Sequence, residues 1–124
     1  MSALILELKQ GELMILNGAV IRFKTRTRIE LNTQARFLFG KQIMQQDDAV
    51  TLPQQIYYAL QQAYIGDEPG RPACLSHARN LIEFARRSST PDTDALLGSM
   101  LAAAAKGAGF DVLKLARQLI RAQI

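Results

Sequence analysis

Cysteine and histidine are nearly absent from this chain of 124 residues, which contains one of each. A single cysteine cannot form an internal disulfide, so we expect a fold held by packing in a reducing compartment. Long hydrophobic runs are missing too, since the longest apolar stretch, residues 95–105, is about half of what a bilayer span needs. The N-terminal segment has no basic lead and meets an acidic residue at Glu7, which argues against a secretory signal. These absences predict a cytoplasmic protein without a membrane span.

Side chains that carry out catalysis are also scarce. Cys74 and His77 lie three residues apart on a predicted helix and supply two metal ligands, whereas a zinc site needs three or four. The acidic residues at 47–48, Asp92 and Asp94 fall at expected helix starts, where the helix dipole explains them. The glycines follow neither the dinucleotide-binding nor the phosphate-loop pattern. We therefore expect no enzyme activity, no metal and no cofactor.

Positive charge is distributed unevenly along the chain. The length and the composition, 48% hydrophobic and 21% charged, are ordinary for a single globular domain. Residues 1–44 hold seven basic and three acidic residues, whereas residues 45–124 hold eight of each, so the net charge of +4 arises entirely in the first third. Such an asymmetry favours a polyanionic partner.

The first third alternates as β-strands do. Leucines at positions 4, 6 and 8 share one face of an extended segment, with Glu7 and Lys9 on the other face. Asn17-Gly18 lies between two apolar runs and is a strong hairpin signal. The predicted strands cover residues 4–9, 13–16, 19–24, 27–31 and 36–39.

The rest of the chain changes to a helical period. Thr51 followed by Gln54 is a capping-box pattern, and the helix that it opens should end at Gly66. Thr90 followed by proline opens another helix. We predict four helices, which run from Thr51 to Gly66, from Pro72 to about residue 88, from Thr90 to Gly107, and from an Asp111 cap onward.

These elements predict an α+β fold, in which a five-stranded antiparallel β-unit precedes a cluster of four helices. We expect residues 1–44 to form a basic, β-rich RNA-binding unit, with the helical unit of residues 45–124 packed on it as one compact domain. The β-unit is too small to cover its own strand edges, which favours a homodimer.

A basic hairpin is the clearest functional signal. Alternation places Arg22, Lys24, Arg26 and Arg28 on one face around a tight tip near Thr25, where they could contact phosphates. The alternative is a solvated hairpin that only confers solubility. Bases of single-stranded RNA could stack on interleaved aromatic residues, which are Phe23, Phe37 and Phe39. A second basic set is typical of the solvent face of the last helix, namely Lys114, Arg117 and Arg121.

Several runs resemble the FlbT family of flagellar-biosynthesis regulators. They are LELKQGE at 6–12, ILNGAVIR at 15–22, TR at 27–28, QIM at 42–44 and IYYALQQAY at 56–64. The resemblance implies a cytosolic post-transcriptional regulator that acts at the 5′ untranslated leader of flagellin messenger RNA, usually lowering its translation and lifetime. It also implies that the protein works alongside a small companion regulator, FlaF.

A fainter resemblance connects residues 4–15 and 28–32 with the carbon-storage regulator (CsrA) family of small RNA-binding dimers. In that family the first strand of one chain and the last strand of its neighbour form a basic RNA-binding edge, which corresponds to residues 3–9 and 36–44 here. Leu8 stands where that family has a basic residue, and Lys41 falls near the end of the last strand. The resemblance implies a CsrA-like β-unit and a dimer formed through strand edges.

We therefore predict a protein that binds the flagellin messenger leader and represses its translation or promotes its decay. The expected RNA-binding residues are Lys9, Arg22, Lys24, Arg26, Arg28, Arg36 and Lys41. The alternative is an adaptor whose helices hold flagellin, FlaF or a secretion component without direct RNA contact. In that case apolar helix surfaces around Tyr57, Tyr58 and Leu97 would matter instead.

Overall fold

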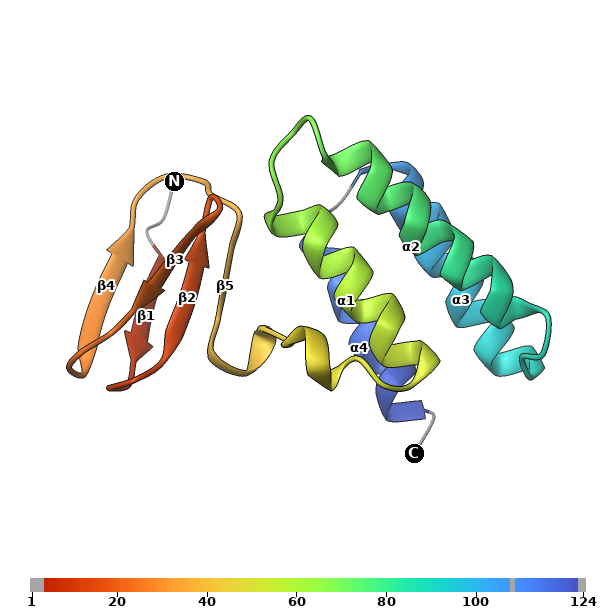
Figure 1. Ribbon diagram of the computed structural model, residues 1–124, viewed down its shortest axis with the longest axis horizontal. Coiled ribbons are helices and arrows are strands. Elements are labelled where there is room, and N and C mark those ends of the chain that lie inside the picture. Colours follow the sequence, from red (N-terminus) through yellow and green to blue (C-terminus); the bar gives the residue numbers. More distant parts are fainter. Residues whose placement is uncertain (1–3, 108, 123–124) are drawn as a thin grey trace. The chain divides into compact units, whose positions relative to one another are not determined.

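A computed structural model describes residues 4–107 and 109–122, and the chain divides into two compact units, one up to Ile43 and one from Met44 onward (Figure 1). The first unit holds the strands β1 (Leu4–Leu8), β2 (Leu13–Leu16), β3 (Ala19–Arg22), β4 (Thr27–Leu31) and β5 (Phe37–Phe39). The second holds the helices α1 (Leu52–Ile65), α2 (Arg71–Arg86), α3 (Pro91–Ala105) and α4 (Phe110–Ala122). Two short 3-10 helices lie before α1, namely η1 (Gly40–Gln42) and η2 (Gln46–Asp48). The prediction of an α+β fold with five antiparallel strands followed by four helices is confirmed.

The expected turn at Asn17-Gly18 joins β2 and β3. Both turn residues have left-handed backbones, with φ of 48° and 89°, as a two-residue hairpin turn of the mirror-image type requires. Leu16 pairs with Ala19 beside this turn. On its other side, β2 pairs antiparallel with β5, so the three-stranded sheet has the order β3-β2-β5.

The remaining strands, β1 and β4, form a separate antiparallel pair, in which Glu7 lies opposite Arg28. The predicted hairpin between the third and fourth strands is therefore wrong. A ladder around Thr25 would have set Arg22 against Arg28, and like charges directly opposite each other destabilise a sheet. Pairing β4 with β1 instead places a carboxylate beside the arginine.

The two sheets share one apolar core. Leu6, Leu8 and Met14 are buried at its centre. Half-buried side chains from the other four strands and from the chain after β3 pack around these three, namely Leu16, Ile21, Phe23, Ile29, Leu31, Phe37 and Phe39. The alternate residues of β1 and β4 face away from this core and are exposed: Ile5, Glu7, Arg28 and Glu30. The first unit is therefore a two-layer β-structure with a charged outer face on the β1-β4 sheet.

The helix starts follow the expected capping signals. The Thr51 N–H donates to Gln54 Oε1 at 2.9 Å, and the Gln54 N–H donates to Thr51 Oγ1 at 3.3 Å, which completes the capping box. At the start of α3, Thr90 Oγ1 accepts the Thr93 N–H at 3.3 Å, and Pro91 is the first helical residue. Asp111 lies in the first turn of α4 and not at its cap, because that helix begins at Phe110.

The helical unit is a four-helix arrangement in which α1 contacts α2 and α4, and α3 contacts the same two helices. The expected apolar positions are buried, including Ile56, Ile82, Met100 and Leu119. Gln61 is the exception, a polar side chain that is only 2% exposed. Its amide accepts from the Met44 N–H at 2.7 Å and donates to the Met44 carbonyl at 2.9 Å, which fixes the segment before α1 to that helix. No helix within the described residues is long and apolar enough to cross a membrane.

Candidate nucleic-acid interface

The predicted RNA-binding residues do not share one hairpin face. Ile21 and Phe23 pack into the core, so Arg22 between them points to the outer side of the three-stranded sheet. Arg28 extends from the outer face of the β1-β4 sheet, opposite Glu7. The two arginines therefore belong to different sheets, and the common face predicted for them is wrong.

Most of the cations nevertheless gather at one end of the first unit. The turn after β1 lies beside the chain that leaves β3, since the Gly11 N–H donates to the Phe23 carbonyl at 2.7 Å and the Phe23 N–H donates to the Glu12 carbonyl at 3.0 Å. Because β5 runs antiparallel to β2, its last residue and η1 come to the same end, at the bottom of the sheets in Figure 1. We call this end of the first unit the basic end. Six exposed basic residues lie there, namely Lys9, Arg22, Lys24, Arg26, Arg28 and Lys41.

Glu12 connects the parts of the basic end. Its Oε1 accepts the Lys9 N–H at 2.6 Å. Its other oxygen, Oε2, lies only 2.6 Å from where a side chain on Gly40 would begin. Gly40 also has a left-handed φ of 56°, which favours glycine. The carboxylate of Glu12 thus lies against the backbone of η1, next to Lys41.

Glu7 is the second carboxylate near the basic end. Arg26 Nη2 lies 3.7 Å from Glu7 Oε2, with side-chain exposures of 81% and 62%. An ion pair so exposed contributes little to stability and leaves both groups accessible to solvent and ligands. Six cations face two carboxylates here, so the basic end keeps a positive excess that can attract a polyanion.

Arg36 lies at the opposite end of the sheets. Its N–H donates to Asn17 Oδ1 at 3.0 Å, and its carbonyl accepts the Asn17 N–H at 2.8 Å. The structure therefore separates Arg36 from the other six predicted residues. The three phenylalanines expected as possible stacking residues are half-buried and pack against the core cluster, so the sheets do not offer their rings to bases.

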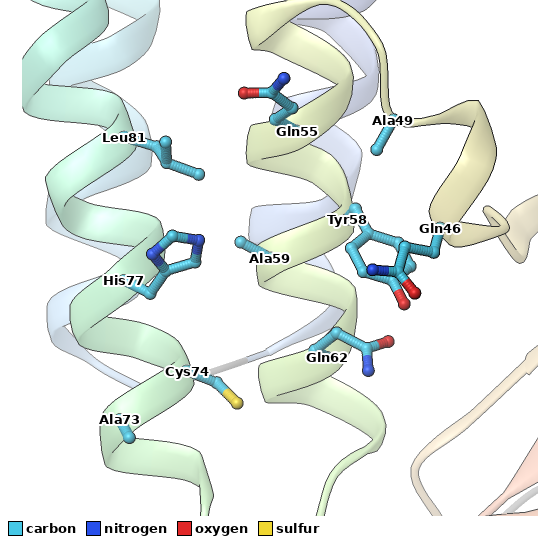
Figure 2. A pocket seen from close by; sticks show the side chains of 10 residues that line it. All are labelled: Gln46, Ala49, Gln55, Tyr58, Ala59, Gln62, Ala73, Cys74, His77 and Leu81. Atoms are coloured by element: carbon cyan, nitrogen blue, oxygen red, sulfur yellow. The ribbon is translucent and has the colours of Figure 1, made fainter.

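A groove in the helical unit is the feature that sequence reasoning missed. It has a volume of about 650 Å³. Its floor is the outward face of α1, and its walls come from α2 and from the segment around η2 (Figure 2). The lining residues are Gln46, Ala49, Gln55, Tyr58, Ala59, Gln62, Ala73, Cys74, His77 and Leu81. Three segments form it, so no single run of sequence could have revealed it.

Cys74 and His77 lie on the α2 wall of this groove, with Cys74 half-buried and His77 exposed. Within the described part of the chain, no group of three or more His, Cys, Asp or Glu side chains is placed to hold a metal ion.

Two of the three residues expected to form the apolar helix surface of an adaptor are buried. Tyr57 and Leu97 are 3% and 0% exposed, so both belong to the core and only Tyr58 reaches a surface, in the groove. Arg117, expected on the solvent face of the last helix, is half-buried and donates from Nη2 to the Tyr57 hydroxyl at 3.2 Å. Lys114 lies over the Phe110 ring, 5.4 Å from its centroid.

One ion pair joins α2 to α3. Arg86 Nε donates to Asp94 Oδ1 at 2.8 Å. This hydrogen bond lowers the pKa of Asp94 and raises the pKa of Arg86. The pair is distant in sequence from the basic end, and its partners are matched, so it adds no net charge for a polyanion.

Residues 4–123 match the family model described as flagellar protein FlbT. A probable flagellum biosynthesis repressor protein FlbT from Allorhizobium ampelinum is 28% identical over 118 residues, covering 95% of this chain and 79% of that protein. Two more proteins of that description align over less than half of their own length. The one from Bradyrhizobium diazoefficiens is 39% identical over 45% of this chain and 41% of its own, and the one from Brucella ovis is 36% identical over 52% and 42%. No solved structure matches the chain with significance.

Proposed function

The chain belongs to the FlbT family of flagellar proteins, and we propose that it represses flagellum biosynthesis by binding the 5′ untranslated leader of flagellin messenger RNA. The names of the three relatives described above, each a probable flagellum biosynthesis repressor, support the repressive role. The main support for RNA binding is the basic end, where six exposed cations outnumber two carboxylates at one end of a small β-structure.

In this mechanism the cations of the basic end contact phosphates of the leader. Each neutralised phosphate releases condensed counterions, so the affinity depends strongly on salt concentration. A protein seated on the leader blocks ribosomes and leaves the rest of the message open to nucleases, which lowers translation and lifetime together. The step requires binding alone, without catalysis, and it takes place in the cytoplasm where ribosomes work.

A homodimer is part of the proposal. Within the described residues β1 hydrogen-bonds to β4 on one side only, and β3 and β5 flank β2, so both sheets end in open edges. On β1, Leu4 and Ile5 are 46% and 50% exposed. An edge strand with exposed apolar side chains readily pairs with another chain, and a second copy satisfies both the edge and the side chains. FlaF or flagellin would bind as an additional protein partner.

A salt titration with purified protein and a flagellin leader RNA tests the proposal. The charge reversal Arg26→Glu with Arg28→Glu alters the basic end, and Lys106→Glu with Arg121→Glu makes the same formal change on exposed residues of the helical unit. If two phosphate contacts are lost, the slope of log affinity against log salt should fall by about 1.4 for single-stranded RNA. The control pair should keep the wild-type slope. An unchanged slope and affinity in the first variant would refute RNA binding by the basic end.

A further inference from the structure

We propose that the groove formed by α1, α2 and the segment around η2, the α1–α2 groove below, binds unpaired nucleobases of an RNA. This inference rests on the proposed function and adds a second kind of contact to it. The basic end accounts for attraction to phosphates, which carries no information about bases. The α1–α2 groove has the chemistry that recognises bases.

The shape of the α1–α2 groove fits a short stretch of stacked bases. Gln55 and Gln62 lie seven residues apart on α1, which corresponds to about 10 Å along the helix axis. Stacked bases are spaced by about 3.4 Å, so the floor has room for two or three of them. Between the two glutamines, Ala59 keeps the floor low and flat, since its side chain is a single methyl group.

The lining of the α1–α2 groove has no lysine, arginine, aspartate or glutamate among its ten residues, although 21% of the chain is charged. Such a surface does not attract phosphates or charged peptide side chains. A nucleobase, in contrast, is uncharged, has flat apolar faces, and presents donors and acceptors along its edge. RNA-binding proteins recognise unpaired bases by stacking them on aromatic residues and by hydrogen bonds to their edges.

Both kinds of group are present in the α1–α2 groove. Tyr58 on α1 and His77 on the α2 wall supply aromatic surfaces for stacking (Figure 2). Three glutamines line the groove. Gln55 Nε2 donates to the Val50 carbonyl at 3.2 Å, whereas the amides of Gln46 and Gln62 each offer a donor and an acceptor that suit a base edge. Among the described residues, the side chains of Gln46, Gln62 and Tyr58 make no hydrogen bond, so these groups are free to bind a ligand.

The same polar groups disfavour an amphipathic helix as the occupant. The apolar face of a helix would cover the amides of Gln46 and Gln62 without offering them partners, and burying an unpaired amide is costly. A base edge supplies those partners. The observations therefore favour a nucleobase over the apolar segment of a protein.

A tryptophan reporter tests the site directly, because the chain contains no tryptophan. Tyr58→Trp places the only indole in the α1–α2 groove, and Ala102→Trp places one on an exposed position of α3 as the matched control. A single-stranded oligonucleotide of about 12 nucleotides, such as oligoadenylate or oligouridylate, should quench the Tyr58→Trp emission, because a base stacks on the indole. A duplex of the same length should not quench it, and neither RNA should affect Ala102→Trp.

Affinity measurements complete the test. Tyr58→Ala should weaken binding of the single strand by about tenfold, as expected for the loss of one stacked base, and should leave the salt slope unchanged. Gln62→Ala, which removes a half-buried amide that makes no hydrogen bond within the described residues, should weaken it by a smaller factor in the same direction.

The outcomes separate this inference from the proposed function. If the wild type binds RNA with the expected salt slope but both variants bind normally and no quenching occurs, the α1–α2 groove is not a base site and the proposed function stands. If the wild type does not bind RNA at all, both fail. Quenching of Tyr58→Trp by purified flagellin but not by RNA would overturn the inference and assign the groove to a protein.

Discussion

The contact between Glu12 and Gly40 gives a quantitative test of how the basic end is built. Gly40→Ala forces a side chain onto a residue with φ of 56°, at a cost of about 1–2 kcal/mol. The new Cβ would also lie 2.6 Å from Glu12 Oε2. The carboxylate must therefore move and lose its 2.6 Å hydrogen bond with the Lys9 N–H, which costs about 1 kcal/mol more. The total loss of stability should be about 2–3 kcal/mol.

A double-mutant cycle separates the two causes. In a Glu12→Ala background, Gly40→Ala should cost only the conformational part, so the coupling between the two substitutions should be about 1 kcal/mol. Urea unfolding followed by circular dichroism measures all four proteins. Gly107→Ala is the control, because Gly107 also has a positive φ, 124°, while a side chain there would meet nothing within 4 Å. If the coupling between Glu12→Ala and Gly40→Ala equals the coupling between Glu12→Ala and Gly107→Ala, Glu12 does not lie against η1. Removing Glu12 should in addition raise RNA affinity, since it takes a negative charge from the basic end.

Three further substitutions test other parts of the structure. Gln61→Glu replaces the amide donor that faces the Met44 carbonyl with a second acceptor, so it should destabilise the protein by about 2–3 kcal/mol at neutral pH and less in acid, as denaturant unfolding can show. Asp94→Asn should lower the melting temperature at neutral pH. The hydrogen bond with Arg86 lowers the pKa of Asp94 in the folded protein. The stability that the Asp94 carboxylate contributes is therefore fully present above the pKa of the unfolded chain, about 4, and is lost as the pH falls through the lower pKa of the folded protein. The melting temperatures of the wild type and the variant should converge below about pH 4. Ile5→Lys changes an exposed side chain on the outer face of the edge strand β1 and should convert a dimer into a monomer, which sedimentation velocity detects. A wild type that sediments as a monomer contradicts the dimer proposal.

The parts of the fold that depend on neighbouring residues could be predicted from the sequence. The hairpin turn at Asn17-Gly18 needs left-handed backbones at two adjacent residues, and few residue types allow them. The capping box of α1 is likewise complete within four residues, from Thr51 to Gln54. Such signals are strong because no distant contact competes with them.

Strand pairing is a different problem, because it depends on which distant strand completes a sheet. Proximity in sequence favoured a ladder between β3 and β4, whereas the structure pairs β4 with β1 and places Glu7 opposite Arg28. The two amide hydrogen bonds of Gln61 also join residues that are 17 positions apart. Nothing local marks a glutamine in an apolar stripe as the partner of a distant backbone.

The candidate site shows the same limit. Counting residues reveals the excess of positive charge in the first 44 residues, but it does not reveal where these charges lie in the folded unit. The topology assigns Lys9 and Lys41, which are 32 positions apart, to one end and Arg36 to the other. The α1–α2 groove could not be predicted from the sequence, because its aromatic and amide side chains come from three separate segments.

The chain separates two kinds of chemistry that a nucleic-acid ligand could use. The unit up to Ile43 holds seven basic and three acidic residues, and the unit from Met44 onward holds eight of each. Attraction to phosphates should therefore come mainly from the first unit and fade as salt rises. The stacking and base-edge hydrogen bonds proposed for the α1–α2 groove do not depend on counterion release. The total affinity for RNA should then fall with salt while the preference for single-stranded over double-stranded RNA is kept. A preference that disappears together with the affinity would mean that both arise from charge alone.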